Sequence, residues 1–180
     1  MRHFAVSAIG RDRPGIVAAV SEVLLRNSGN IEDSQMTILR GRFTIMLVVS
    51  TADDVDQRRL DSDLSEVGER LALDAVSVNE VSEFEPEGEP QASHILSVYG
   101  IDHPGIVHTV TSALAGQGVN ITDLTTRLVA GKEAEPIYAM MLEVAVPPKT
   151  PTVEIEASLR EACAREGVEL TIRPLEQDTL

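Results

Sequence analysis

Two copies of one short motif contain the side chains of this sequence that are best suited to bind a small molecule. The first copy is Gly-Arg-Asp-Arg-Pro-Gly-Ile-Val at residues 10–17, and the second is Gly-Ile-Asp-His-Pro-Gly-Ile-Val at residues 100–107. The offset of 90 (104 minus 14) continues without a gap to an Asn-Ile pair at residues 30–31 and 120–121. The chain therefore contains one small unit twice, and we expect two domains in tandem.

The turn into the first helix of each copy could bind a carboxylate. A helix N-terminus presents backbone N–H groups without intrahelical partners and carries a partial positive charge. Gly15 and Gly105 lack the side chain that would keep a ligand away from that helix end. The same glycines could instead serve only a tight turn and close helix packing, and the sequence leaves both alternatives open.

Asp12 and Asp102 lie beside these turns and allow two interpretations. Each carboxylate could accept a hydrogen bond from the ammonium group of an amino acid. Each could instead cap its helix by accepting from N–H groups of the first turn, which is the interpretation that the residue type favours. A ligand carboxylate at the helix end would be repelled by a neighbouring Asp, so a zwitterion fits this site better than a simple anion.

Asn30 and Asn120 begin the next predicted strand and carry both a hydrogen-bond donor and an acceptor. Either could orient an α-amino acid, or could simply form the turn after a helix. The copies differ where Arg13 corresponds to His103 and where Ala-Ala at 18–19 corresponds to His-Thr at 108–109, so the two loops need not bind alike. The candidate ligand-binding residues are Asp12, Arg13, Pro14, Gly15, Ile16, Asn30, Ile31, Asp102, His103, Pro104, Gly105, Ile106, Asn120 and Ile121.

Apolar spacing predicts the elements that must position these loops in the first copy. We expect a strand over residues 3–9, then a helix from Pro14 that ends near Ser28 and Gly29, with Gly29 in a positive φ conformation. Two strands follow at 31–39 and 42–50, joined by a hairpin at 40–41. The last two elements are a strand at 75–81 and, before it, a helix whose apolar face carries Leu60, Leu64, Val67 and Leu71. This βαββαβ order predicts an α+β, ferredoxin-like fold, with a four-stranded antiparallel sheet and both helices on one face.

The second copy repeats the same order. We expect a strand at 94–99, a helix from Pro104 to about Gly116, a strand from Asn120, a looser turn at 130–136 and a strand at 137–146. Thr150 is predicted to cap the next helix, with Pro151 at its first position, and that helix turns Ile155, Leu159, Ala162 and Cys163 inward before a last strand at 168–173. A frayed tail is expected from Pro174. The predicted domains are 1–82 and 93–174, with an acidic linker at 83–92 and the tail at 175–180.

Composition limits the partners and the location. The net charge of -14 and a pI near 4.6 argue against direct nucleic-acid binding, which requires clustered basic residues, and the run Arg40-Gly41-Arg42 is interpreted as a solvated hairpin tip. The sequence contains one cysteine, no recognisable leader and no apolar run long enough to span a membrane. We therefore expect a cytoplasmic protein that does not contact a membrane.

Neither an enzyme nor a cofactor or metal protein is indicated. The sequence contains no phosphate-binding Gly-rich loop, no cysteine pair and no nucleophile-and-base pattern. Asp102, His103 and His108 could suggest a metal, but the two histidines are five residues apart and lie on different helix faces. His103 is expected beside the positive end of the helix, where protonation of its imidazole would be disfavoured.

With its repeated Gly-x-Asp-x-Pro-Gly-Ile-Val turn, its Asn-Ile pairs and its element order, the sequence resembles the ACT domain family of small-molecule regulatory modules. The resemblance covers nearly the whole chain, and the tandem arrangement is similar to ACT-only members that regulate transcription in glycine metabolism. It implies domains paired side by side into one sheet, and an amino acid bound between the loop of one and the second strand of the other. It also implies a protein partner such as a transcriptional activator.

A different class of function stays open. The domains could form a ligand-free scaffold that builds a homo-oligomer or holds a partner, in which case the loops would be purely structural. Oligomerisation is expected under either hypothesis, since a domain of about 80 residues buries a limited fraction of its surface.

Overall fold

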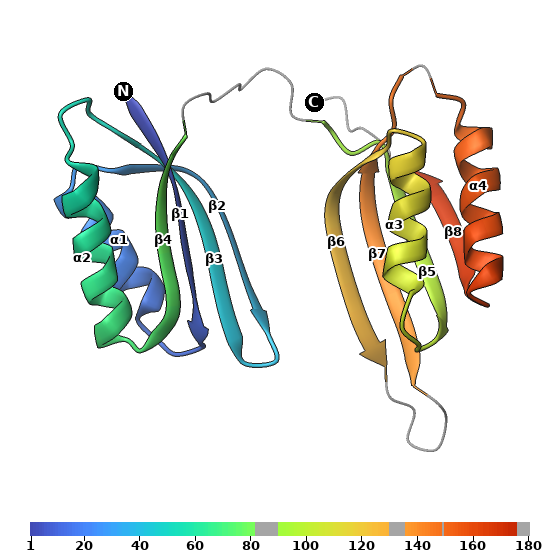
Figure 1. Ribbon diagram of the computed structural model, residues 1–180, viewed down its shortest axis with the longest axis horizontal. Coiled ribbons are helices and arrows are strands. Elements are labelled where there is room, and N and C mark those ends of the chain that lie inside the picture. Colours follow the sequence, from blue (N-terminus) through green and yellow to red (C-terminus); the bar gives the residue numbers. More distant parts are fainter. Residues whose placement is uncertain (82–89, 130–135, 149, 176–180) are drawn as a thin grey trace. The chain divides into compact units, whose positions relative to one another are not determined.

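The computed structural model describes residues 1–81, 90–129, 136–148 and 150–175 (Figure 1). The chain divides into two compact units, Met1–Pro86 and Glu87–Leu180. Unit 1 contains β1 (Arg2–Arg11), α1 (Ile16–Arg26), β2 (Asn30–Leu39), β3 (Arg42–Thr51), α2 (Gln57–Arg70) and β4 (Leu73–Val81). Unit 2 contains β5 (His94–Ile101), α3 (Ile106–Gly116), β6 (Asn120–Val129), β7 (Ile137–Ala145), α4 (Thr152–Arg165) and β8 (Glu169–Pro174).

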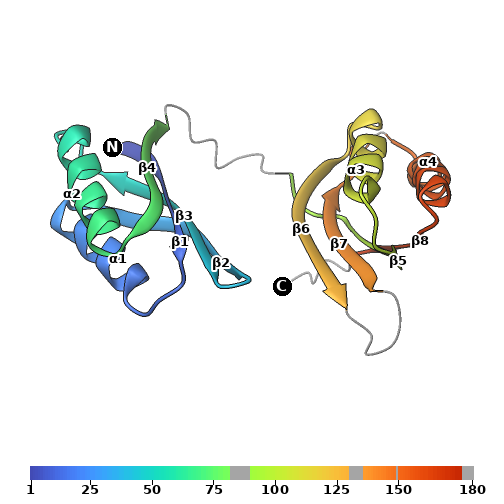
Figure 2. The ribbon, with the colours of Figure 1, turned by 60° about the horizontal axis from the view of Figure 1, so that its bottom comes forward.

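Each unit has the predicted βαββαβ fold. The strand orders are β2-β3-β1-β4 in unit 1 and β6-β7-β5-β8 in unit 2, and the strand pairs are antiparallel. Both helices of a unit lie on the same face of its sheet (Figure 2). The ferredoxin-like fold expected from the sequence is confirmed for both copies.

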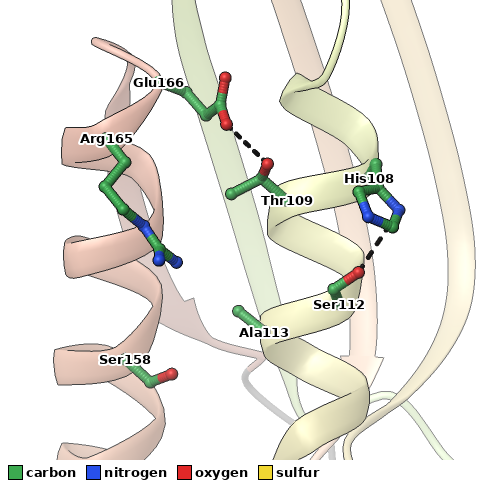
Figure 3. A pocket seen from close by; sticks show the side chains of 7 residues that line it. All are labelled: His108, Thr109, Ser112, Ala113, Ser158, Arg165 and Glu166. Carbon is green, nitrogen blue, oxygen red and sulfur yellow. Dashed lines mark hydrogen bonds between the residues drawn. The ribbon is translucent and has the colours of Figure 1, made fainter.

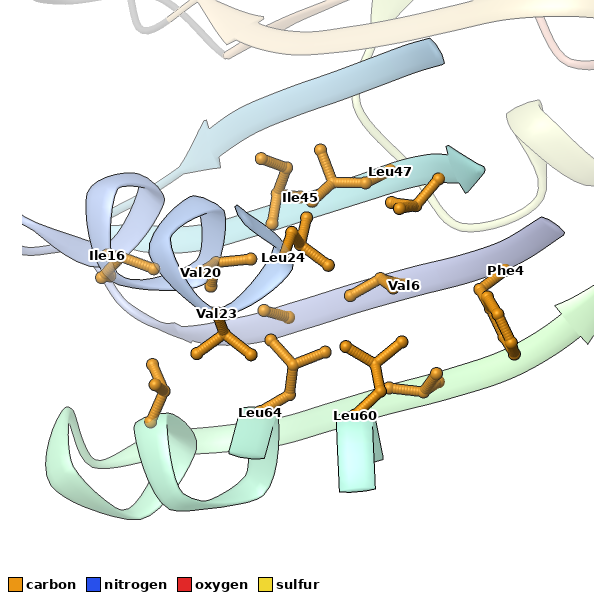
Figure 4. Packing of buried hydrophobic residues seen from close by; sticks show 14 of the residues in the cluster. Phe4, Val6, Ile16, Val20, Val23, Leu24, Ile45, Leu47, Leu60 and Leu64 are labelled. Carbon is orange, nitrogen blue, oxygen red and sulfur yellow. The ribbon is translucent and has the colours of Figure 1, made fainter. Parts of the chain in front are cut away.

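The core of unit 1 is mainly aliphatic, with Phe4 and Phe43 as its aromatic members, and it holds α1 against β1. Alternate residues of β1, among them Phe4 and Val6, are buried under the helices, because successive side chains of a strand point to opposite faces. Val20 from α1 and Leu60 from α2 belong to the same buried cluster (Figure 4). Burying each such aliphatic side chain stabilises the fold by about 1.5–3 kcal/mol, and this packing positions the loop between β1 and α1.

The edge strands β2 and β6 are left uncovered by the helices. Met36 and Ile38 pair in register with the buried Ile45 and Phe43, so they point to the helix face, yet they are 46% and 47% exposed. In β6 the apolar Leu124 is exposed in the same way. Each unit therefore presents an apolar edge next to its first helix.

The first helix of each unit begins later than predicted. Pro14 and Pro104 were expected at the first helical position, but α1 begins at Ile16 and α3 at Ile106. Gly15 has φ +96°, and this left-handed conformation lies outside the helical region, so the helix can begin only after it. Gly105, with φ +113°, repeats this geometry in unit 2.

The residue with positive φ after the end of α1 also differs from the prediction. The helix ends at Arg26, and Ser28, not Gly29, takes the positive φ of 54°. A Cβ at Gly29 would lie 3.0 Å from a methyl of Val49 and 3.2 Å from the carbonyl oxygen of Leu24. Close packing against β3 and α1 therefore favours glycine at position 29.

The start of α4 contradicts the predicted cap. The helix begins at Thr152 after Pro151, with no side-chain hydrogen bond at its N-cap, and the backbone N–H of Thr150 donates instead to the carbonyl of Pro147. By contrast, Asp56 does cap α2 by accepting from the N–H of Arg58 at 3.0 Å. Pro174, expected to begin the tail, belongs to β8 and pairs with His94 at a sheet edge, where proline is tolerated.

Several predictions fall outside the described residues. They are the acidic linker over residues 83–89, most of the turn at 130–136 and the tail at 176–180.

Candidate functional site

The loop between β1 and α1 presents an open helix end at Gly15. A Cβ added there would meet no atom within 4 Å, so the backbone conformation, and not close packing, calls for glycine. Arg13, Pro14 and Gly15 are all exposed, and the carbonyl of Gly15 accepts the first intrahelical bond, from the N–H of Ala19 at 2.9 Å. Close packing is therefore excluded as the reason for this glycine, whereas a tight turn and access to the helix end both agree with its conformation.

A backbone hydrogen bond of Asp12 joins this loop to the neighbouring hairpin. Its N–H donates to the carbonyl of Gly41 at 3.0 Å, and the N–H of Asp102 donates to the carbonyl of Pro136 at 3.3 Å. Neither carboxylate caps its helix, since Gly15 and Gly105 are the N-cap residues and no side chain bonds there. The favoured capping interpretation of both aspartates is wrong, because the left-handed glycine separates each Asp from the first helical turn.

One candidate residue in each loop is buried, unlike its neighbours. Ile16 and Ile106 are only 1% and 2% exposed and pack into the cores. Their side chains hold the helix in place, and only their backbone groups could reach a ligand.

The Asn-Ile pair lies far from the loop of its own unit. Asn30 begins β2 and pairs with Ser50, whereas the loop lies at the other end of the sheet, where Arg11 pairs with Arg42. Helix α1, with 11 residues, separates the two places by about 16 Å. The same separation holds for Asn120 and Ile121 in unit 2, so one unit alone does not bring its candidate residues together.

The corresponding loop of unit 2 is held by Glu166, which directly follows α4. His103 Nε2 lies 2.8 Å from the carbonyl oxygen of Glu166, and Nδ1 lies 3.1 Å from that of Pro104. The hydroxyl of Thr109 donates to the Glu166 carboxylate at 2.6 Å. Glu166 escaped prediction because it lies outside the repeated motif, and its counterpart at the C-cap of α2 is the apolar Leu71.

The pKa of His103 also shifts in the direction opposite to the one expected from the sequence. The Glu166 carbonyl, followed by the Pro104 carbonyl, raises the pKa of His103 above its ordinary value. A neutral imidazole has one N–H, so only the charged form donates to both acceptors. The carboxylate of Glu166, 3.7 Å from Nδ1, adds a smaller contribution that also raises the pKa of His103.

A shallow polar groove of about 470 Å³ lies beside this contact, between α3 and α4. It contains charges of both signs and several hydroxyl groups (Figure 3), from His108, Thr109, Ser112, Ala113, Ser158, Arg165 and Glu166. In unit 1 the positions of His108 and Thr109 are taken by Ala18 and Ala19. The polar groove is thus a difference between the copies.

Two further features are absent from the residues that the structure describes. No group of three or more His, Cys, Asp or Glu side chains there could hold a metal ion. None of the helices in the described ranges is long and apolar enough to cross a membrane.

Comparison with known proteins agrees with this architecture. A family model described as the ACT domain matches residues 2–77. A UPF0237 protein of Methanopyrus kandleri is 40% identical over 81 residues, which cover 44% of this chain and 90% of that protein. The chain belongs to the ACT domain family. Its ACT fold occurs twice, once in each unit.

Two comparisons extend over both ACT units. The glycine cleavage system transcriptional repressor of Escherichia coli is 26% identical over 160 residues, which cover 89% of this chain and 81% of the repressor. The crystal structure of a protein of unknown function from Galdieria sulphuraria superposes with a TM-score of 0.79 at 29% identity, over 97% of this chain and 98% of that one. Membership of the ACT family and similarity to a repressor support a regulatory, amino-acid-binding role.

Proposed function

We propose that this tandem ACT protein binds a small amino acid and, in response, regulates genes of amino-acid metabolism, including glycine metabolism, through a protein partner. The observation that carries the proposal is the open, left-handed Gly15 at the start of α1. It leaves space for a ligand directly over the positive end of a helix.

An amino acid matches the groups around this space. Backbone N–H groups of the first turn of α1 would donate to its carboxylate. The exposed carboxylate of Asp12, which makes no cap bond, would accept from its ammonium group. A zwitterion satisfies both charges at once, whereas a simple anion would meet the Asp12 carboxylate unpaired.

The proposal includes pairing with another ACT unit, since Asn30 lies too far from the loop of its own unit to reach the same ligand. When two such sheets join edge to edge in antiparallel fashion, the start of one edge strand comes beside the hairpin end of the other. The exposed Met36 and Ile38 on β2 supply apolar area for such an edge. We therefore propose a homo-oligomer in which Asn-Ile of one ACT unit completes the loop site of another.

The partner is proposed to be a protein such as a transcriptional activator, and not DNA. The net charge of -14 opposes direct phosphate binding, and the Escherichia coli relative is named as a transcriptional repressor. The cytoplasm is the proposed location, in keeping with a single cysteine, Cys163, which is buried.

A ligand-free scaffold remains the second candidate, and one observation favours it. In unit 2, the ring of His103 contacts the carbonyl oxygen of Glu166, and Thr109 donates to the Glu166 carboxylate, so protein contacts alone hold that loop. Together with the uncovered edges of β2 and β6, this arrangement could serve assembly only.

A thermal-unfolding screen of the full chain against the twenty amino acids separates the two candidates. A ligand at about 100 times its dissociation constant stabilises the native state by about 2.7 kcal/mol, which raises the melting temperature by several degrees. A selective rise supports the sensor. A flat screen with an intact oligomer would contradict it and favour the scaffold.

A further inference from the structure

Four arginines surround a single backbone hydrogen bond at the loop end of unit 1. The N–H of Asp12 donates to the carbonyl of Gly41 at 3.0 Å. Each of the two joined residues is flanked in the chain on both sides by arginine, and these four are Arg11, Arg13, Arg40 and Arg42. All four are exposed, and they form a basic cluster in a chain with 15 basic residues and a net charge of -14.

Most of this basic cluster forms no ion pair within the described part of the unit. Arg42 pairs with Asp74. Arg11, Arg13 and Arg40 make no ion pair or side-chain hydrogen bond with any residue in the part of the chain that the structure describes. Arg2, by comparison, is fully engaged, since it binds both carboxylate oxygens of Glu80 and the carbonyl of Val55.

The fold does not require arginine at these positions. Arg11 and Arg42 lie directly opposite each other on β1 and β3, and like charges in such a cross-strand pair destabilise a sheet. The matching last pair of β5 and β7 in unit 2 is Ile101 with Ile137. The same place in the same fold therefore accepts two apolar residues, and the repulsion in unit 1 needs another explanation.

We propose that the basic cluster is a docking surface for an acidic segment of a partner protein. A planar guanidinium matches a carboxylate with two parallel hydrogen bonds, and arginine is enriched in protein interfaces. The four side chains stand exposed on a loop and a hairpin, whereas small molecules bind in concave sites. The inference rests on the protein-partner part of the proposed function and names the chemistry of that partner.

The net negative charge of the chain favours a short acidic peptide segment over a nucleic acid as the ligand of this cluster. At physiological ionic strength the Debye length is about 8 Å, so distant carboxylates of the chain are largely screened from a ligand held by the cluster. A segment with a few carboxylates can lie within that range. An extended polyanion would reach beyond the cluster over a chain whose net charge is -14.

Fluorescence anisotropy with the full-length chain tests the proposal. The probe is a short labelled peptide rich in Glu and Asp, and the same peptide with Gln and Asn is its control. The informative variant combines Arg11→Ile with Arg42→Ile, which installs the pair that unit 2 already has. Arg58→Gln with Arg59→Gln, two exposed residues of α2, removes the same charge elsewhere.

We expect the acidic peptide to bind and the amide peptide not to bind. The variant with the Ile pair should bind the acidic peptide about tenfold or more weakly, and the α2 variant should bind it as the wild type does. Failure of the acidic peptide to bind, or equal losses in both variants, overturns the proposal. So does tighter binding of a single-stranded oligonucleotide, which would indicate nucleic acid, or self-association that depends on Arg11 and Arg42, which would indicate a second copy. Amino-acid-dependent melting of the same variants tests the proposed function separately.

Discussion

His103 reaches across unit 2 to the carbonyl oxygen of Glu166, 2.8 Å from its Nε2, although 63 residues separate the two in the chain. This contact joins the loop before α3 to the turn after α4. In unit 1 the same positions hold Arg13 and Leu71, and no such link is formed between them within the described residues. The two ACT units thus have the same fold but hold their candidate loops differently.

The His103 contact predicts a pH-dependent stability. Its pKa is raised in the folded state by the Glu166 and Pro104 carbonyls, with smaller contributions from the charges of Glu166 and Asp102. The contribution is therefore fully present below the unfolded pKa, near 6.5, and is lost as the pH rises through the folded pKa. Between these two values the free energy of unfolding should fall as pH increases.

Denaturant unfolding as a function of pH measures this effect, with an NMR titration of the His103 ring beside it. His103→Arg, which carries the charge of Arg13 at all these pH values, should flatten the slope. An unchanged slope in that variant would show that His103 is not responsible.

A second prediction concerns two glycines of unit 2 with opposite surroundings. A Cβ at Gly100 would lie 2.5 Å from a methyl of Val168 and 3.2 Å from its Cα, whereas a Cβ at Gly116 would meet nothing within 4 Å. Gly100→Ala should cost about 1–3 kcal/mol through overpacking. Gly116→Ala, at the last residue of α3, should stabilise the native state by about 0.4–1 kcal/mol. Equal effects in denaturant melts would contradict this packing.

A third prediction separates a true helix cap from an apparent one. Asp56 accepts from the N–H of Arg58 at the start of α2, and Asp56→Ala should cost about 1 kcal/mol. Thr150, which has the residue type of a cap but makes no such bond, should change stability by less than about 0.5 kcal/mol in Thr150→Ala. Comparable losses would mean that Thr150 caps α4 in solution.

A fourth prediction concerns the backbone of the candidate loop. Gly15, with φ +96°, has open space around it, so Gly15→Ala should cost about 1–3 kcal/mol by conformational strain alone. Gly15→Asn should cost less, because Asn tolerates positive φ better than Ala. Equal stability of both variants and the wild type in chemical unfolding would show that the loop relaxes.

The spacing of apolar residues and the internal repeat were enough to predict the order of elements, because the spacing shows which face of each helix or strand must be buried. Leu60 and Leu64, for instance, were assigned to one buried face of a helix, and both are buried. The start of α1 was not predictable in the same way. Pro-Gly fits the first turn of a helix and a left-handed N-cap equally well, and only the φ of Gly15 decides.

The surroundings of His103 could not be predicted from sequence because they depend on tertiary contacts. Its partners are two backbone carbonyls, which every residue has, and one of them belongs to the distant Glu166. A sequence motif describes residue types in one segment only. It therefore could not predict the contact with Glu166 or the direction of the His103 pKa shift.

Calorimetric titration of the full chain with the amino acid selected by thermal unfolding tests the central claim most directly. Gly15→Asn fills the open space at the start of α1, and Gly118→Asn makes the same change at another positive-φ glycine, with φ +68° and no atom within 4 Å of its Cβ. We expect saturable binding by the wild type and by Gly118→Asn, and an affinity at least about tenfold weaker in Gly15→Asn. Equal binding by all three proteins, or none by the wild type, would contradict it.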